Sequence, residues 1–189
     1  MKYDKSYLRR NSILQRKKRY LTVKKFNFDL IFKLITKHFY KKKITIAGYY
    51  PSNYEVNILK FLKKASQNKF KIALPVIRPS GRMSFKSWIF NEPLYVSAFG
   101  TLEPLNTNKE MTPDLIMVQL VAFDKKLNRI GYGKGYYDRI LQKISNLKRK
   151  KIFLGIAYSF QKCRRIPVNK HDFRLDYIFT ERGIISSNK

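Results

Sequence analysis

FDKKLNRIGYGKGYYDR, residues 123–139, joins an apolar run to a segment with helical periodicity. The run before it, residues 115–123, is typical of a buried strand. After it, apolar side chains recur at helical spacing from Ile140 to Leu147, so we expect a helix to begin near Gly135 or Tyr136. The stretch therefore predicts a Gly-x-Gly-x-Gly loop that leaves a strand and opens a helix.

A loop of this kind is a good cradle for phosphate. Glycine lets backbone N–H groups turn toward an anion without a side chain in the way. The helix N-terminus adds partial positive charge, and Lys134 and Arg129 add full charges. The spacing fits neither the Walker A loop nor the dinucleotide fingerprint, whose third glycine comes one residue later. By itself, the glycine pattern is equally compatible with a turn that binds nothing.

The chain is strongly basic, with a formal net charge of +29 over 189 residues. Its apolar fraction of 44% suits one well-buried domain, residues 1–189, which includes a basic N-terminal helix over residues 1–22. Such a charge attracts phosphates, nucleic acids or anionic membranes. The lysines, however, are spread from end to end, as drift in an A/T-rich genome would produce. We favour drift plus an anionic-ligand site over a dedicated nucleic-acid binder.

The remaining composition excludes several classes of protein. A single cysteine, Cys163, excludes an internal disulfide, and His38 and His171 lie too far apart for a local metal motif. No apolar run approaches the roughly 20 residues of a membrane span. The basic N-terminus lacks the apolar core of a secretory signal, although a transit peptide is an alternative. We expect a cytoplasmic protein with no membrane partner.

Apolar periodicity predicts an alternation of helices and strands along most of the chain. This order indicates an α/β fold with a mostly parallel sheet flanked by helices on both faces, a Rossmann-like three-layer arrangement, with a small antiparallel arm near residues 83–96. We expect helices over 1–22, 26–39, 55–62 and from 136, and strands over 44–50, 71–77, 83–86, 115–123, 151–158 and 175–181.

The longer string, Phe-Asp and then Arg-x-Gly-x-Gly-x-Gly-Tyr-Tyr-Asp-Arg, resembles the signature of the 5-formyltetrahydrofolate cyclo-ligase (methenyltetrahydrofolate synthetase) family. The resemblance runs from Lys5 to Glu181. Its further elements are Leu-Pro at 74–75, Met-x-Phe at 83–85, Gly-x-x-Glu-Pro at 100–104, His-Asp at 171–172 and Leu-Asp-x-Ile at 175–178. One position departs: the family usually has proline where this chain has Gln119, which leaves the exit geometry of the strand open.

The resemblance implies ATP-driven cyclisation of 5-formyltetrahydrofolate to 5,10-methenyltetrahydrofolate, with ADP and phosphate released through a phosphorylated imidate. ATP would be the co-substrate and Mg2+ the cofactor. We expect a monomer without a specific nucleic-acid partner.

The resemblance also implies roles for individual residues. The family's N-terminal Lys-x-x-x-Arg falls on Lys5 and Arg9, with Arg10 leaving the register open by one residue. The ATP-binding residues would be Lys5, Arg9, Arg129, Ile130, Gly131, Tyr132, Gly133, Lys134, Gly135, Tyr136 and Tyr137. The folate-binding residues would be Arg9, Tyr50, Glu55, Tyr132, Gly133, Lys134, Gly135 and Tyr136. The metal ligands would be Asp138 and Asp172.

The acidic residues also have plainer interpretations. Glu55, expected in a first helical turn, could simply complement the helix dipole. A carboxylate also suits the pterin, whose amino group and adjacent N–H form a paired donor edge. Asp138 could serve as a helix cap and Asp172 as a loop acid, with Asp124 an alternative metal ligand. Trp88 is interpreted as packing.

Two other functions compete with the cyclo-ligase reaction as interpretations of this sequence. One is a basic RNA- or DNA-binding module, whose affinity would fall steeply with salt. The other is a degenerate family member that binds folate without catalysis.

Overall fold

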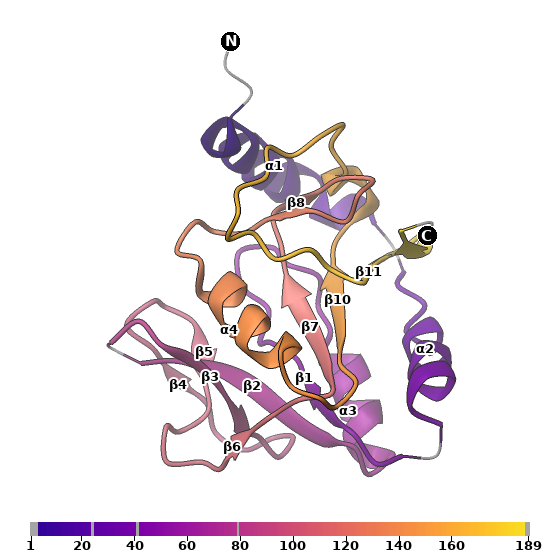
Figure 1. Ribbon diagram of the computed structural model, residues 1–189, viewed down its shortest axis with the longest axis vertical. Helices are drawn as coiled ribbons and strands as arrows, with labels where there is room; N and C mark the ends of the chain where they lie inside the picture. The colour runs from indigo at the N-terminus through magenta and orange to yellow at the C-terminus, as the bar shows by residue number, and fades with distance from the viewer. Residues whose placement is uncertain (1–3, 24, 41, 79, 188–189) are drawn as a thin grey trace.

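Five parallel strands form the middle of the main sheet. A computed structural model describes residues 4–23, 25–40, 42–78 and 80–187, and within them this sheet has eight strands in the order β12-β11-β10-β7-β1-β2-β3-β6 (Figure 1). Strands β2, β1, β7, β10 and β11 run parallel, whereas β12, β3 and β6 are antiparallel additions at the two edges. The bounds are β1 (Thr45–Ala47), β2 (Lys71–Ile77), β3 (Met83–Ser87), β6 (Glu110–Met111), β7 (Leu115–Gln119), β10 (Ile152–Ile156), β11 (Tyr177–Thr180) and β12 (Gly183–Ser186).

Helices cover both faces of this sheet because its central strands are apolar on both sides. Along β7, Leu115 and Met117 join the core beneath α2 (Asp29–Phe39) and α3 (Leu59–Gln67). The alternate residues Ile116 and Val118 join the core beneath α4 (Tyr136–Ser145), which crosses the near face in Figure 1. The expected three-layer α/β fold with a mostly parallel sheet is confirmed.

The apolar run over residues 115–123 is two strands rather than one. After Gln119 the chain leaves the sheet, and β8 (Ala122–Phe123) pairs with β9 (Arg129–Ile130) in a separate hairpin. The buried Asp124 accepts hydrogen bonds from two backbone amides in the hairpin turn, one side chain there and one amide beyond it. Its carboxylate therefore organises this turn, and the glycine loop leaves the hairpin rather than the sheet.

The helix expected around Glu55 begins later than the sequence pattern indicates. Helix α3 starts at Leu59, where the Asn57 side chain accepts the Leu59 N–H at 3.0 Å. Glu55 instead ends a turn in which its N–H donates to the Ser52 carbonyl at 2.9 Å. The expected position of Glu55 in a first helical turn is therefore wrong, and its carboxylate does not complement that helix dipole.

The N-terminal helix is docked onto the molecule. Helix α1 (Lys5–Arg19) is capped by the Asp4 side chain and is followed by a 3-10 turn, η1 (Tyr20–Thr22). Leu8 is buried against Val121, Ala122 and Ile130 of the β8–β9 hairpin. This contact lays the basic helix along the glycine loop that follows the hairpin. Residues 1–3 of the expected helix lie outside the described residues.

A second two-stranded sheet forms an arm. Strands β4 (Tyr95–Val96) and β5 (Leu102–Glu103) pair antiparallel, and Glu103 accepts the N–H of Ile77 at the end of β2. The antiparallel arm expected near residues 83–96 is therefore split between two sheets. Strand β3 joins the main sheet, and β4 and β5 form the arm.

Candidate active site

A cavity of about 1220 Å³ opens at the carboxyl ends of β1 and β7. From β1 the chain continues to β2 on one side, whereas β7 pairs with β1 on the other side. Strands β1 and β7 therefore flank the point where the strand order reverses. Open α/β sheets bind ligands at such a point. The walls come from α1, the loop after β1, the arm, the glycine loop, the first turns of α4 and residues 169–172.

The glycine loop needs its glycines for conformation and for space. Gly133 has φ +105°, and Gly135, which caps α4, has φ +65°, values that other residues rarely adopt. A Cβ on Gly133 would lie 3.2 Å from Cζ of Arg9. Arg9 Nε also donates to the Gly131 carbonyl at 2.8 Å, so α1 rests directly on the loop. Lys5 and Arg9 face the cavity, whereas Arg10 is exposed and points elsewhere.

The tip of the arm contacts the glycine loop. Lys134 Nζ lies 4.4 Å from the centroid of the Phe99 ring, and that ring meets Tyr136 edge-on with centroids 5.7 Å apart. Lys134 itself is exposed at the mouth of the cavity. A cation there is free to reach an anionic ligand at the cost of one cation–π contact.

Arg129 is a buried cation on the floor of the site. Its Nη2 donates to Asp138 Oδ1 at 2.8 Å, and its side chain is 3% exposed. Burial lowers the pKa of Arg129, and the Asp138 charge opposes that change. Arg129 Nε and the nearby Tyr137 hydroxyl are both buried, and neither has a hydrogen-bond partner among the residues that the structure describes. A buried polar atom normally has a partner, so both are suited to a ligand.

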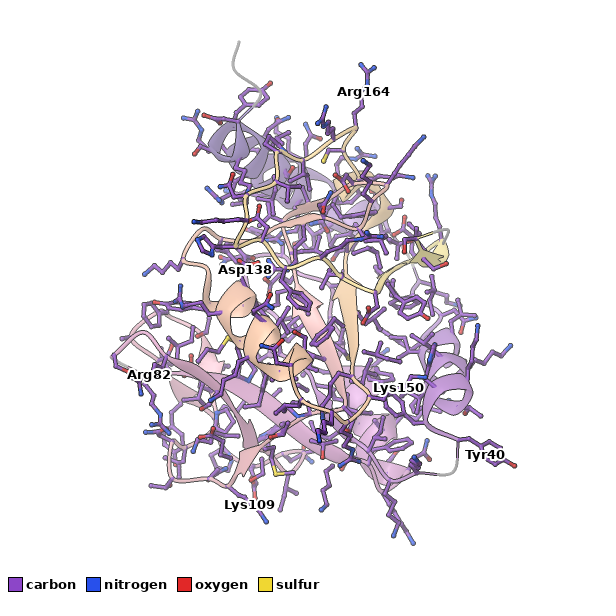
Figure 2. All side chains as sticks on the ribbon, in the orientation of Figure 1. Tyr40, Arg82, Lys109, Asp138, Lys150 and Arg164 are labelled. Carbon is purple, nitrogen blue, oxygen red and sulfur yellow. The ribbon has the colours of Figure 1, made fainter. Side chains whose placement is uncertain are left out.

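The two carboxylates expected to bind metal line the same cavity. Asp138, in the first turn of α4 (Figure 2), accepts from Arg129 and from the Phe173 N–H through Oδ1 alone. Asp172 pairs with Lys5 and accepts the Asn169 N–H through Oδ2 alone. Each therefore keeps one oxygen clear of other described residues. No group of three or more His, Cys, Asp or Glu side chains that could hold a metal occurs within the described ranges.

Two carboxylates with one available oxygen each fit a magnesium ion that a nucleotide shares. Mg2+ is commonly held by one or two carboxylates together with substrate phosphates and water, and it needs no cage made wholly of protein.

Glu55 lies one layer behind the cavity wall. It is 8% exposed, and Oε1 accepts the Tyr132 hydroxyl at 2.5 Å. Oε2 accepts the Ser52 N–H at 3.0 Å and Gln119 Nε2 at 2.9 Å. Its three partners line the cavity, whereas Glu55 does not. Burial raises the pKa of Glu55, opposed by the Tyr132 and Ser52 hydrogen bonds, the Arg16 charge and the Gln119 hydrogen bond.

Every other residue expected at the site lies on the wall of this cavity, including Tyr50. That set is Lys5, Arg9, Tyr50, Arg129, Ile130, Gly131, Tyr132, Gly133, Lys134, Gly135, Tyr136, Tyr137, Asp138 and Asp172.

Sequence reasoning missed two residues that contact expected site residues: Gln119, which donates to Glu55, and Arg16, which donates to Tyr132. Gln119 departs from the family pattern, and that departure was the available signal for its contact with Glu55. Arg16 sits in the basic run of residues 16–19, where nothing in the sequence separates it from its neighbours.

These features define the class of protein: a three-layer α/β protein with a candidate ligand site at the carboxyl edge of its parallel strands. Residues 1–181 match the 5-formyltetrahydrofolate cyclo-ligase family. The chain belongs to that family. The expectation of an enzyme of the cyclo-ligase class is confirmed by this membership.

Three similar proteins span much of the chain. The 5-formyltetrahydrofolate cyclo-ligase of Mycoplasma genitalium is 33% identical and aligns over 93% of this chain and 96% of its own. The cyclo-ligase of Haemophilus influenzae is 31% identical over 69% of this chain and 72% of its own. The solved structure of Aquifex aeolicus 5,10-methenyltetrahydrofolate synthetase superposes with a TM-score of 0.74 at 28% identity, covering 98% of this chain and 93% of that one.

Within the described residues, every helix is too short or too polar to cross a membrane.

Proposed function

We propose that this chain catalyses the ATP- and magnesium-dependent cyclisation of 5-formyltetrahydrofolate to 5,10-methenyltetrahydrofolate. The observation that carries the proposal is the convergence on one cavity of every expected ATP-, folate- and metal-binding residue except Glu55, which lies directly behind its wall. The names of the similar cyclo-ligases and of the Aquifex synthetase support the same reaction.

The chemistry requires activation of the formyl oxygen, which is a poor leaving group. That oxygen attacks the γ-phosphorus of ATP, so an O–P bond forms, the bond to the β-phosphate oxygen breaks and ADP leaves. N10 of the folate then attacks the imidate carbon and loses its proton. The C–O bond breaks, and inorganic phosphate carries away the original formyl oxygen. Catalysis of such steps is mainly positioning and charge neutralisation.

The side chains around the glycine loop supply that neutralisation. Amides of the loop and of the first turn of α4, together with Lys134 and Arg129, would hold the phosphates. The unpartnered Arg129 Nε and Tyr137 hydroxyl support a ligand at this position. Lys5 and Arg9 of α1 add charge beside the glycine loop.

Asp138 and Asp172 would hold the magnesium ion through their available oxygens. When bound, the ion would neutralise charge on the phosphate oxygens. Because Asp138 also pairs with Arg129, the same carboxylate would orient a phosphate-binding guanidinium.

The folate would occupy the part of the cavity near Tyr50, Tyr132 and Gln119. Glu55 would act there as the anionic anchor for the pterin, either through its partners on the wall or after the Tyr132 ring moves aside. The aromatic tip of the arm, Phe99, is placed to cover a bound ligand beside Tyr136.

We expect this enzyme to act as a cytoplasmic monomer with no nucleic-acid partner. The exposed basic residues Arg82, Lys109, Lys150 and Arg164 lie at well-separated places in Figure 2. Such scatter favours compositional drift over a dedicated basic face.

The test is whether purified protein forms methenyltetrahydrofolate from 5-formyltetrahydrofolate, ATP and magnesium, followed by the near-ultraviolet absorbance of the product. Product that needs both ATP and magnesium would support the proposal. Folded protein that binds the folate without turnover would instead identify a degenerate family member. Folded protein that binds RNA in a salt-sensitive way and forms no product would favour the nucleic-acid module.

A further inference from the structure

Arg16 is a buried cation to which the reaction assigns no role. It lies in α1, is 1% exposed, and donates from Nη2 to the Tyr132 hydroxyl at 2.6 Å. Its Nη1 is 3.4 Å from the Leu120 carbonyl, and its Nε has no hydrogen-bond partner among the described residues. A buried guanidinium is costly unless its charge is compensated, and Tyr132 links Arg16 to the carboxylate of Glu55.

The donors and acceptors in the two hydrogen bonds of the Tyr132 hydroxyl follow from the protons available. A guanidinium only donates, so the Tyr132 oxygen must accept from Arg16. The single hydroxyl proton of Tyr132 is then directed to Glu55 Oε1, 2.5 Å away. Arg16, Tyr132 and Glu55 therefore form a relay in which the arginine polarises the hydroxyl that holds the carboxylate. The relay joins α1, the glycine loop and the loop after β1.

Gln119 and Ser52 hold the other carboxylate oxygen. Oε2 receives Gln119 Nε2 at 2.9 Å, the Ser52 N–H at 3.0 Å and the Ser52 hydroxyl at 3.4 Å. An ionised carboxylate accepts without donating, so all these contacts favour the anion.

The Arg16 guanidinium carries a full positive charge that lowers the pKa of this carboxyl. Four phenols also interact electrostatically with Glu55, and burial raises the pKa values of these residues, Tyr49, Tyr132, Tyr137 and Tyr158. They stay neutral over the acidic range in which Glu55 titrates. Burial raises the pKa of Glu55, and the Tyr132 and Ser52 hydrogen bonds, the Arg16 charge and the Gln119 hydrogen bond oppose that rise. Loss of Arg16 should therefore move the pH at which the anion is lost.

We propose that Arg16 is a positioning residue of the folate site, which acts through the Tyr132 hydroxyl to keep Glu55 an anion and to fix the wall that Tyr132 and Gln119 present to the ligand. This inference rests on the proposed function, because the amino group and adjacent N–H of the folate pterin are the donors that would interact with Glu55. It gives the N-terminal helix a role at the folate end of the cavity, in addition to the contacts of Lys5 and Arg9.

The test compares Arg16→Met, Arg16→Lys, Tyr132→Phe and the double variant Arg16→Met/Tyr132→Phe with the native chain. The dissociation constant for 5-formyltetrahydrofolate is measured as a function of pH, without ATP, and thermal unfolding verifies that each variant is folded. Lys17→Met is the matched control, because it removes an exposed cation from the same helix without touching the relay.

In the native chain, folate affinity should fall as the pH drops through the pKa of Glu55. Arg16→Met should move the midpoint of that loss upward by about one pH unit, as expected when an opposite charge is removed. Arg16→Lys keeps a positive charge and should therefore shift the midpoint less than Arg16→Met does. Lys17→Met should leave the midpoint unchanged. Because the relay passes through one hydroxyl, Arg16→Met should add little in the Tyr132→Phe background.

An unchanged midpoint in folded Arg16→Met would overturn the inference, as would a shift of equal size with and without the Tyr132 hydroxyl. Both results require that the native chain binds the folate. A native chain that binds none at any pH would reject the proposed function, and the inference with it.

Discussion

Buried Arg129 and partly exposed Asp138 form an ion pair, with Nη2 and Oδ1 2.8 Å apart. The arginine expected at the phosphates therefore orients the carboxylate expected at the metal. Arg129 lies in β9, directly before the glycine loop, and Asp138 lies in the first turn of α4 directly after it, so one interaction links the two ends of the loop. A defect at either residue should disturb phosphate and metal binding together.

Asp138→Asn keeps the shape of the side chain and removes its charge. We expect turnover to fall at least tenfold, with a higher magnesium requirement, because the phosphate-bound ion loses an anionic ligand. The free energy of unfolding should fall by about 1–3 kcal/mol, because Arg129 stays buried without its counter-ion. Steady-state kinetics against magnesium and chemical denaturation measure the two effects.

Asp172→Asn is the matched control for that variant. Its partner, Lys5, is partly exposed, so activity should fall with a smaller change in stability. Native magnesium dependence in folded Asp138→Asn would remove Asp138 from the metal site.

Lys134→Ala should slow turnover and raise the KM for ATP while leaving the fold intact. The side chain is exposed, and its contact with the Phe99 ring accounts for about 0.5–1 kcal/mol of stability at most. Kinetics with varied ATP and a thermal melt provide the measurement, with Lys148→Ala, beyond the end of α4, as the control. ATP kinetics that match the native chain would argue against the phosphate assignment.

Ionisation of Glu55 should affect the pH dependence of the free energy of unfolding as well as folate binding. Burial raises its pKa above the ordinary value of about 4.3, so the folded state holds this proton more tightly than the unfolded state. The associated stabilisation is complete below the ordinary pKa and is lost as the pH rises through the folded pKa. Glu55→Gln should lack that step and should weaken folate binding more than ATP binding.

Denaturation curves at a series of pH values, with binding measured on the same preparations, would check both expectations for Glu55→Gln. Equal loss of the two affinities would point to misfolding instead of a lost folate contact.

Gln119→Met preserves the length of the side chain but removes the donor to Glu55. Hydrogen bonds to charged groups contribute about 1.5–3 kcal/mol, so folate affinity should fall roughly tenfold to a hundredfold. Gln119→Glu would set a second carboxylate beside Glu55 and should move the pH dependence of folate binding upward. Calorimetric titration with 5-formyltetrahydrofolate measures both, and native affinities in both variants would exclude Gln119 from the site.

The glycine loop and α4 could be predicted from sequence because their signals are local. Helix α4 begins at Tyr136, where the periodic pattern begins and where Gly135 adopts a left-handed backbone. The residues of the glycine loop and α4 lie together because they are consecutive in sequence, and their meeting with Lys5 and Arg9 depends on the docking of α1 on the β8–β9 hairpin. Local patterns of this kind carry most of the fold.

Long-range packing decided the rest. Apart from Gln119, the run over residues 115–123 is apolar, because the β8–β9 hairpin is buried against α1. Hydropathy therefore does not show that the chain leaves the main sheet after Gln119. Glu55 precedes its helix because Asn53 and Tyr54 both take positive φ, and the Tyr54 ring packs on Tyr20 with centroids 4.8 Å apart. Contacts between distant segments set these details.

Phosphoryl transfer to the formyl oxygen can be followed with a heavy-oxygen label. Substrate labelled at the formyl oxygen would be converted by the protein with unlabelled ATP and magnesium, and the released inorganic phosphate analysed by mass spectrometry. We predict one labelled oxygen in each phosphate and one ADP per methenyltetrahydrofolate formed. Unlabelled phosphate, or product formed without ADP, would contradict the mechanism.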